Sequence, residues 1–316
     1  MKYFSLFTGI GGFEVGIQNT CGDNKYSECV GYSEIDKYAI QIYQSHFPTH
    51  KNYGDITKIN EKELPDFDLL VGGFPCQSFS IAGKRGGFND TRGTLFFEIA
   101  RILQAKKPRL CLLENVKGLL SHDNGSTFKT IITTLDELGY DVQWQVLNSK
   151  NHGVPQNRER VYIVGHLRGT PRPEVFPILT GNENHIQEVT QSVPQAQRVY
   201  GSGGISPTID IAQGGNRQPK IIAKTVRAGG RSSPHGSKQN WDNYEVEGAI
   251  RRLTPKECER LQGFPDDWTA KGTQCMQEHR HLERCTQPIS DTQRYKTLGN
   301  AVTTKTVQAI MERILA

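Results

Sequence analysis

The feature that most constrains this chain is an apolar run that passes directly into a glycine pair and a cysteine. Residues 67–71 are followed by Gly72-Gly73-Phe74-Pro75-Cys76. That order predicts a buried strand with the cysteine presented on a loop at its carboxyl end. In an open α/β sheet, this edge is where ligands bind. A cysteine behind a rigid proline is better placed there as a nucleophile than as core filler, although a buried structural thiol remains the plain alternative.

The amino-terminal segment also combines a strand with glycines. The strand candidate 3–7 leads into Gly9-Ile10-Gly11-Gly12, a turn that lets backbone N–H groups approach a ligand closely. A second strand candidate ends at Glu34, about 20 residues after the glycines, where an acid can accept both ribose hydroxyls. Asp55 offers a further acid in a loop, suited to an adenine amino group. Helix capping or solvation explains either acid singly, but not both beside this turn.

The glycine turn differs from that of a dinucleotide enzyme. It reads Gly-x-Gly-Gly rather than Gly-x-Gly-x-x-Gly, and no phosphate-cradling Lys-Ser/Thr follows it. Such a turn suits a nucleoside ligand without a phosphate, and S-adenosylmethionine is the obvious example. Its methyl-bearing sulfonium would then point toward the loop that holds Cys76.

An acid is expected at the same edge of the sheet, and two arginines at the mouth of another strand. The apolar residues 110–113 end at Glu114, so this carboxyl group should emerge beside Cys76. Arg158 and Arg160 stand at the mouth of another strand candidate. These segments make the constellation around Cys76 more specific.

Together, six motifs resemble the DNA cytosine-5 methyltransferases, and they occur in that family's order. The resemblance covers essentially the whole chain apart from roughly residues 166–250. The motifs are the glycine turn, Pro75-Cys76-Gln77, Glu114-Asn115-Val116, the Gln-x-Arg-x-Arg segment at 156–160, Leu-Gln-Gly-Phe-Pro at 261–265 and Gly-Asn-Ala-Val at 299–302.

The resemblance implies covalent catalysis at C5 of cytosine. Because C5 is a poor nucleophile, addition of the Cys76 thiolate to C6 is needed to place electron density on C5. Glu114, in its protonated form at N3, would draw charge from the developing carbanion. Arg160, with Arg158 beside it, would bind O2 of the base and neutralise charge near the thiolate. Methyl transfer, loss of the C5 proton to an unidentified base and elimination of Cys76 would complete the cycle.

The resemblance also implies the fold. We expect an α/β protein with a doubly wound, mostly parallel sheet, the S-adenosylmethionine-dependent methyltransferase fold, and a smaller irregular target-recognition domain. The catalytic domain would comprise residues 1–166 plus 290–316, and the recognition domain residues 167–289. In the family, the Gly299-Asn300 motif helps to line the cofactor pocket. The expected cofactor-binding residues are Phe7, Gly9, Gly11, Gly12, Glu34, Ile35, Asp55, Ile56, Pro75, Asn300 and Val302.

A cytosine inside the duplex has to rotate out of the stack to reach such a pocket. The segment after Cys76 is rich in glycine and positive charge, and we expect it to close on DNA. Thr208 and Thr225 both match the Thr-aliphatic element of the family's recognition domains, and we favour Thr208. Ordinary loop polarity explains the other recognition-region candidates equally well. The expected DNA contacts are Ser80, Lys84, Arg85, Thr208, Arg227 and Arg231, with Lys238 and Trp241 as further candidates.

Composition bounds the setting. The chain has 316 residues and a formal net charge of +5, which is compatible with a polyanionic partner. No apolar stretch approaches the roughly 20 residues that cross a bilayer, and no signal-peptide pattern is present. The seven scattered cysteines fit a reducing cytosol. The spacing of Cys275, His279, His281 and Cys285 is not a usual zinc pattern, so we expect no metal.

We therefore expect a cytoplasmic, bacterial or phage-encoded monomer that acts on double-stranded DNA and has no membrane partner. A cognate restriction endonuclease would be linked in function but not bound. One rival is a tRNA cytosine-5 methyltransferase, although the Cys-Phe-Thr tripeptide typical of that branch is absent. The other is a catalytically silent DNA-binding regulator of the same fold, against which the intact catalytic positions argue.

Overall fold

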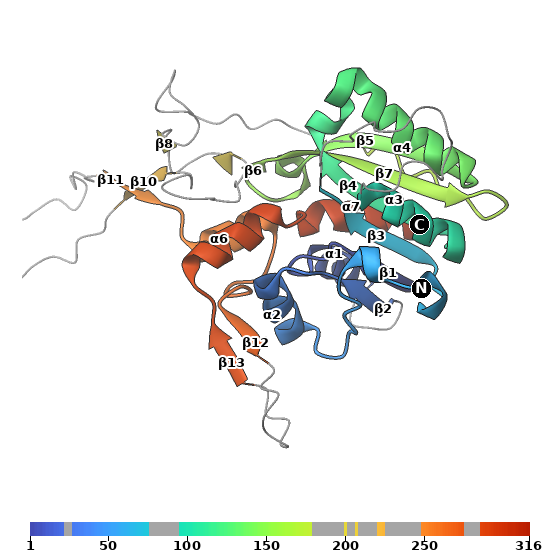
Figure 1. Cartoon of the computed structure of the whole chain (residues 1–316). Coiled ribbons are helices and arrows are strands. Elements are labelled where there is room, and N and C mark those ends of the chain that lie inside the picture. The colour runs from blue at the N-terminus through green and yellow to red at the C-terminus, as the bar shows by residue number, and fades with distance from the viewer. Residues whose placement is uncertain are drawn as a thin grey trace, which may run out of the picture.

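The computed structural model describes residues 1–21, 27–75, 95–178, 199–200, 206–207, 220–224, 248–274 and 285–316. A six-stranded sheet of order β2-β1-β3-β4-β7-β5 forms its centre (Figure 1). The first four of these strands run parallel, whereas β7 is antiparallel to both of its neighbours. The strands are β1 (Lys2–Leu6), β2 (Glu28–Ser33), β3 (Leu69–Gly73), β4 (Leu110–Val116), β5 (Tyr140–Asn148) and β7 (Glu159–Leu167).

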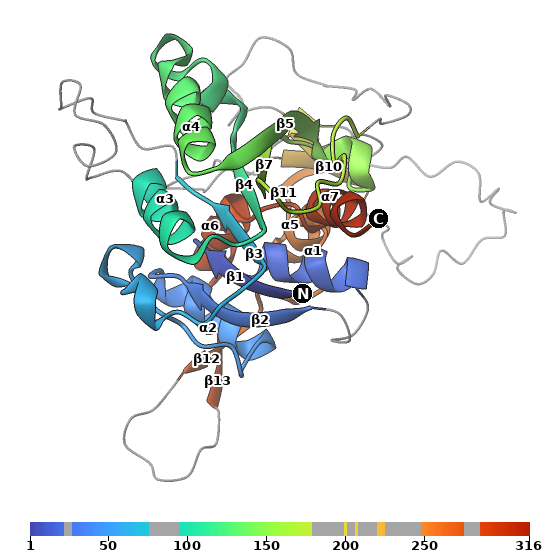
Figure 2. The ribbon, with the colours of Figure 1, turned by 90° about the vertical axis from the view of Figure 1, so that its right-hand side faces the viewer.

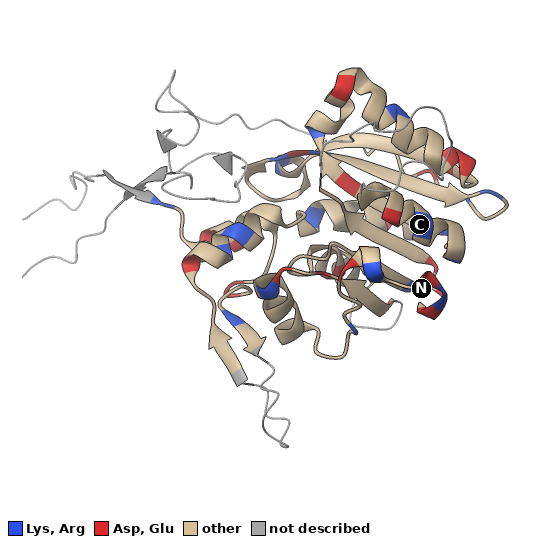
Figure 3. Cartoon of the chain, viewed as in Figure 1, with Lys and Arg blue, Asp and Glu red and all other residues tan. Residues whose placement is uncertain are grey.

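The central strands are apolar because both of their faces are covered. Leu69, Leu70 and Val71 of β3 are fully buried, and so are Leu112 and Leu113 of β4. A parallel strand between two helical layers reads as a continuous apolar run rather than an alternating one. Charged positions gather toward the strand ends, as Figure 3 shows. The strand expected to end in the glycine pair is confirmed, since β3 includes Gly72 and Gly73.

Helices cover the two faces of the sheet. On one face, α3 (Leu95–Lys106) and α4 (Ser126–Glu137) pack against β1, β3, β4 and β7. On the other face, α1 (Gly12–Cys21) and α7 (Thr304–Leu315) pack against each other and against β3 and β4. Figure 2 shows the two pairs on opposite sides of the sheet. The expected doubly wound, mostly parallel α/β fold is confirmed.

A third cluster of buried side chains brings the carboxyl-terminal segment beside the glycine turn. It joins α2 (Lys37–His46), α5 (Pro255–Gln262) and α6 (Asp291–Asn300) to Ile10. A capping box between Thr254 and Glu257 begins α5. Gly263, at a φ of 79°, ends it. The domain boundary at residue 289 remains a prediction, and α5, which precedes it, packs in this cluster with α2.

Shorter elements complete the described structure. A hairpin follows α5 and lies against α2, as seen at the lower left of Figure 1. Among the described residues, no helix is long and apolar enough to cross a membrane. The remaining elements are β6 (Gln156–Asn157), β8 (Val199–Tyr200), β9 (Ser206–Pro207), β10 (Lys220–Lys224), β11 (Gly248–Arg252), the hairpin β12 (Lys271–Gln274) and β13 (Cys285–Pro288), and the 3-10 helices η1 (Ile56–Lys58), η2 (Glu61–Glu63), η4 (Lys117–Leu120), η5 (His122–Gly125) and η6 (Ser149–His152).

Several expected site residues lie outside the described residues. They are Cys76, Ser80, Lys84, Arg85, Thr208, Thr225, Arg227, Arg231, Lys238, Trp241, Cys275, His279 and His281.

Candidate active site

The glycine turn after β1 is tightly packed, which explains two of its glycines. A Cβ atom on Gly11 would lie 2.7 Å from Cε2 of Phe47, and the φ of Gly11 is +93°. A Cβ atom on Gly12 would lie 2.6 Å from Cγ1 of Val302. Larger residues at either position would displace one of these neighbours. The turn is thus wedged between the end of α2 and the Gly-Asn-Ala-Val segment.

Glu34, directly after β2, is bound to the glycine turn. Its Oε2 atom accepts a hydrogen bond from the Gly9 N–H at 2.8 Å. Its Oε1 atom accepts from the N–H groups of Ile35 at 2.8 Å and Asp36 at 2.9 Å. A carboxylate has about four lone-pair sites, so three backbone donors orient this one and leave capacity for a ligand hydroxyl. The adjacent Ile35 side chain is 72% exposed, an apolar surface beside the acid.

Asn52 joins the two predicted acidic loops, and the sequence argument missed it. Its Oδ1 atom accepts from the N–H groups of Glu34 at 3.3 Å and Gly54 at 2.9 Å, and its Nδ2 atom donates to the Glu34 carbonyl at 3.2 Å. The Ser33 hydroxyl donates to the Gly54 carbonyl at 2.6 Å. The sequence signal was an asparagine two residues before a glycine, a common turn pattern.

Asp55 begins η1 as its N-cap. Its Oδ1 atom accepts from the N–H of Thr57 at 3.0 Å and from the Thr57 hydroxyl at 2.8 Å. These hydrogen bonds lower the pKa of Asp55, so the group is a carboxylate at neutral pH. The side chain of the next residue, Ile56, is buried in the core. Helix capping, the alternative to a binding role, therefore accounts for Oδ1 of Asp55 only. The other oxygen, Oδ2, lies 3.9 Å from Nζ of Lys58.

Glu114 and Arg160 meet at the carboxyl edge of the sheet. The Arg160 Nε atom lies 3.1 Å from Glu114 Oε1, and both side chains are mostly buried. The strand register places Glu114 beside Gly73 of β3. A Cβ atom on Gly73 would lie 3.1 Å from Glu114 Oε2. One carboxyl oxygen therefore faces the arginine, and the other faces the end of the strand that leads to Cys76.

Asn115 ties the end of β4 to the segment before Cys76. Its side chain is 2% exposed, and its Nδ2 atom donates a hydrogen bond of 2.9 Å to the Phe74 carbonyl. Its Oδ1 atom accepts from the Val116 N–H at 2.8 Å. Because both ends of the amide are used, the Phe74 carbonyl is held beside the end of β4.

Comparison with known proteins places this constellation in a family. The family model for C-5 cytosine-specific DNA methylases matches residues 1–202 and 179–316, which together span the chain. The chain belongs to this family. It is 39% identical over 332 residues to the type II methyltransferase M1.ScrFI of Lactococcus lactis subsp. cremoris, covering 99% of this chain and 78% of that protein.

A second relative agrees with this assignment, and a solved structure shows the same fold. The methylase is 35% identical over 351 residues to the type II methyltransferase M.HhaI of Haemophilus parahaemolyticus, covering 99% of this chain and 94% of that one. A solved structure of a Spodoptera frugiperda DNMT2 mutant superposes with a TM-score of 0.67 at 19% identity, covering 100% of this chain and 99% of that chain. The fold is therefore that of the S-adenosylmethionine-dependent methyltransferases, and the chain is a DNA cytosine-5 methyltransferase.

Arg158 of this methylase is buried, with 3% of its surface exposed. Its Nη2 atom donates to the Ala301 carbonyl at 2.9 Å and to the Gly299 carbonyl at 3.3 Å. Burial, and then the neighbouring charge of Arg160, lower the pKa of Arg158 to about 10, so the group stays cationic at neutral pH. Its hydrogen bonds go to the Gly-Asn-Ala-Val turn, whereas Arg160 is the arginine paired with Glu114.

Further buried hydrogen bonds connect the Gly-Asn-Ala-Val turn to its neighbours. Gln262, from the Leu-Gln-Gly-Phe-Pro motif, donates to the Leu298 carbonyl at 3.0 Å and accepts from the Thr303 hydroxyl at 2.8 Å. The Ser149 hydroxyl donates to the Thr303 oxygen at 2.9 Å. All of these side chains are buried. Asn300, which lies between Leu298 and Thr303 in the sequence, is exposed at the end of α6.

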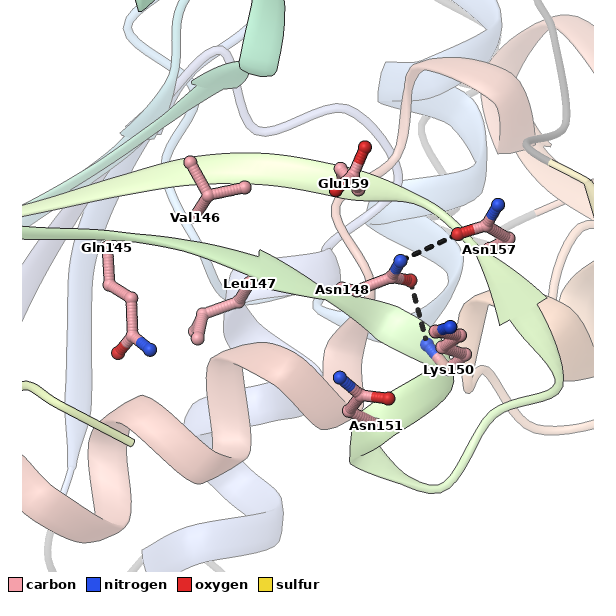
Figure 4. Close-up of a pocket in the computed structure, with 8 residues that line it drawn as sticks. All are labelled: Gln145, Val146, Leu147, Asn148, Lys150, Asn151, Asn157 and Glu159. Atoms are coloured by element: carbon pink, nitrogen blue, oxygen red, sulfur yellow. Dashed lines mark hydrogen bonds between the residues drawn. The ribbon is translucent and has the colours of Figure 1, made fainter. Parts of the chain in front are cut away.

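A separate polar pocket of about 370 Å³ lies at the carboxyl end of β5 (Figure 4). Asn148 there accepts from the N–H groups of Lys150 and Arg158 and donates to Asn157. No expected site residue lines it. In the described part of the chain, no cluster of His, Cys, Asp and Glu side chains suits a metal ion. The pocket is lined by Gln145, Val146, Leu147, Asn148, Lys150, Asn151, Asn157 and Glu159.

Proposed function

We propose that this methyltransferase modifies C5 of a specific cytosine in double-stranded DNA, through base flipping and a covalent bond between Cys76 and C6. The observation that carries the proposal is the Glu114–Arg160 pair beside the strand that leads to Cys76. An acid and a cation at a substrate edge suit a base that has to accept electron density in a ring. Asn115, which holds Phe74, supports the placement of the nucleophile.

The amino-terminal site suits S-adenosylmethionine, which supplies an electrophilic methyl group when bound. Glu34 would accept the ribose hydroxyls, since its carboxylate is fixed by backbone donors and retains free acceptor capacity. Ile35 would pack on the flat adenine ring, and Asp55 would accept its amino group. A Cβ atom on Gly9 would meet nothing within 4 Å, so the turn leaves room beside it. Phe7, Pro75, Asn300 and Val302 would complete the pocket, with Ile56 beneath Asp55.

The residues at the catalytic edge would divide the work. The Cys76 sulfur would form a bond to C6, and the C5–C6 electron pair would move to C5. Glu114 would hold a proton at N3 while Arg160 holds O2, so that the ring accepts this charge. C5 would then form its bond to the methyl group as the methyl–sulfur bond breaks, and the electron pair of that bond would stay on the sulfur of the departing S-adenosylhomocysteine. Loss of the C5 proton to solvent or another base returns the electron pair to the ring and releases Cys76.

Arg158 would act through position rather than through contact with the base. Its hydrogen bonds to the Gly299 and Ala301 carbonyls join the strand that carries Arg160 to the turn that carries Asn300. Buried cation–carbonyl bonds of this kind fix a backbone firmly. The arrangement would therefore set the distance between the catalytic edge and the cofactor pocket.

Target recognition would fall to segments outside the described residues. Lys84 and Arg85, with Ser80, would contact the DNA near the flipped base, and Thr208 would contact the backbone beside it. Arg227 and Arg231 would read guanine edges. The relatives M1.ScrFI and M.HhaI are type II methyltransferases by name. We infer a similar setting, in which a cytoplasmic monomer of bacterial or phage origin protects DNA from a separate cognate endonuclease.

Incubation with tritiated S-adenosylmethionine and either duplex DNA or tRNA tests the substrate. Label in duplex DNA, stable as 5-methylcytosine on hydrolysis, supports the proposal, and bisulfite sequencing then gives the site. Label in tRNA alone would establish the RNA enzyme instead. DNA binding without any transfer would establish a silent regulator. The Cys76→Ser variant is the control, because its hydroxyl is a far weaker nucleophile than a thiolate while DNA binding should survive.

A further inference from the structure

Trp268 reaches the centre of the glycine turn from the opposite end of the chain. Its Nε1 atom donates a hydrogen bond of 2.9 Å to the carbonyl of Ile10, 258 residues away in sequence. Ile10 lies between Gly9 and Gly11, and its own side chain is fully buried. An indole N–H that points at a backbone carbonyl is a directional contact rather than general packing.

This hydrogen bond completes the restraint of one peptide group. The N–H of Gly11 donates to the Thr8 carbonyl at 3.2 Å, and the Ile10 carbonyl of the same peptide accepts from Trp268. Rotation of the peptide would break both bonds. Gly9 and Gly11 have φ values of 59° and 93°, a region that glycine enters freely but in which nothing intrinsic holds it. The indole thus supplies rigidity that the glycines lack.

The surroundings of Trp268 hold the indole in place. The His46 ring stacks on it with a centroid distance of 3.5 Å and an interplanar angle of 4°, and His46 Nε2 bonds the Trp268 carbonyl at 2.8 Å. Phe264 packs against it at 5.5 Å. The next residue, Thr269, donates its N–H at 2.8 Å to the buried carboxylate of Glu259. A donor fixed in this way loses little freedom when the turn forms.

We propose that Trp268 is a positioning residue for cofactor binding, which holds the Ile10–Gly11 peptide in the conformation that accepts S-adenosylmethionine. The inference rests on the proposed function of the glycine turn. Trp268 contacts the turn and α2, whereas the Glu114–Arg160 pair lies on β4 and β7. Its loss should therefore weaken cofactor binding and leave the chemical step intact.

The test compares Trp268→Phe with the matched control Trp144→Phe. Trp268→Phe keeps an aromatic ring for His46 and removes the N–H, while Trp144 is 46% exposed on β5, beside Phe128. Calorimetry should show that Trp268→Phe raises the Kd for S-adenosylmethionine about tenfold, the effect of leaving a buried carbonyl without its donor. The KM for the cofactor should rise equally, while kcat at saturating cofactor and the control variant stay within twofold of the parent. Equal cofactor affinity in Trp268→Phe and the parent would overturn the inference.

A spectroscopic measurement on the unsubstituted protein covers the case in which Trp268→Phe does not fold. In ¹⁵N-labelled enzyme the three indole N–H resonances are assigned by Trp144→Phe and Trp241→Phe, which leave that of Trp268 by elimination. Addition of S-adenosylmethionine should shift the Trp268 resonance and leave that of Trp144 in place. Cofactor binding with an unmoved Trp268 resonance contradicts this inference alone. Failure of the unsubstituted enzyme to bind S-adenosylmethionine overturns both the inference and the proposed function of the turn.

Discussion

The cofactor turn and the catalytic edge are built by different means, although they lie at the same end of one sheet. At the turn, side chains hold backbone groups: Glu34 accepts from three N–H groups, and the Trp268 indole donates to a carbonyl. Gly12 also fits against Val302. At the catalytic edge, two charged side chains bind each other in the Glu114–Arg160 ion pair, and Arg158 joins this edge to the Gly-Asn-Ala-Val turn. Substitutions in the first region should therefore change cofactor affinity and folding, and those in the second should change the rate of chemistry.

The largest effect is expected from Glu114→Gln at the catalytic edge. The amide cannot deliver a proton to N3 as a carboxylic acid does, so kcat should fall by about 10²- to 10⁴-fold. The KM for S-adenosylmethionine should stay within about twofold. The matched control is Glu159→Gln, which breaks an exposed ion pair with Lys117 and should change kcat less than about threefold. Single-turnover kinetics compares the two variants. A rise in the cofactor KM of Glu114→Gln without loss of kcat would contradict the assignment of separate roles to the two regions.

Glu14, in the first turn of α1, should make stability depend on pH. The residue is fully buried, and neither carboxyl oxygen has a hydrogen-bond partner among the described residues. Burial raises the pKa of Glu14 from 4.5 to about 7. Burial also raises the pKa values of Tyr3, Cys29 and Tyr43 around it, so these groups stay neutral between pH 5 and 8.

The sign of this effect follows from the raised pKa. The folded protein keeps the Glu14 proton above pH 4.5, where the unfolded protein loses it. The contribution of Glu14 to the free energy of unfolding is therefore complete at low pH and is lost as pH rises through 7. As the pH is raised from 5 to 8, the free energy of unfolding of Glu14→Gln should increase relative to that of the parent, by up to roughly 3 kcal/mol. Denaturant unfolding at both pH values measures it, with the exposed Glu28→Gln as control. A stability difference that is independent of pH would show that Glu14 does not titrate there.

Gly12→Ala tests the packing of the cofactor turn. The added Cβ atom would lie 2.6 Å from Cγ1 of Val302 and 2.8 Å from its carbonyl oxygen, so α1 or the Gly-Asn-Ala-Val turn has to shift. We expect a loss of about 1–3 kcal/mol in the free energy of unfolding, together with weaker cofactor binding. Gly118→Ala is the matched control, because nothing lies within 4 Å of its added Cβ atom. Equal losses of stability in the two variants on thermal unfolding would contradict the packing argument.

The smallest effect is expected from Glu34→Gln. The amide keeps the size of the side chain, but it loses the charge and replaces one accepting oxygen with an NH2 group, which cannot accept from a backbone N–H. The Kd for S-adenosylmethionine should rise about tenfold, while kcat at saturating cofactor changes little. Calorimetry measures the Kd, and steady-state kinetics on the same preparation measures kcat. A large fall in kcat at unchanged Kd would place Glu34 with the catalytic edge instead.

The sequence predicted the positions of the acids in both regions, but not the contacts of every side chain. The meeting of Glu114 with the end of β3 was predictable, because apolar runs that end in polar residues share one edge of a parallel sheet. The position of Glu34 followed from its distance to the glycines. Arg158 was expected beside the base, but the direction of a guanidinium depends on which carbonyls pack against it. These carbonyls belong to a turn more than 140 residues later.

The contacts of Asn52 and Trp268 were also beyond the sequence argument. Asn52 looks like an ordinary turn residue until β2 places Glu34 beside it. Trp268 follows a recognizable motif, but nothing local indicates that its indole will meet Ile10. Side-chain contacts across distant segments depend on the packing of α2, α5 and α6, which spacing alone does not give.

The measurement that tests the central claim most directly is covalent trapping on duplex DNA with 5-fluorocytosine at the target position. If Cys76 adds to C6, methyl transfer has to be followed by loss of the C5 substituent as a cation, and fluorine cannot leave in that form. The account predicts one methyl transfer and a denaturation-resistant enzyme–DNA complex that requires S-adenosylmethionine, is absent in Cys76→Ala and forms slowly in Glu114→Gln. Continued turnover on the fluorinated duplex without a trapped complex would contradict it.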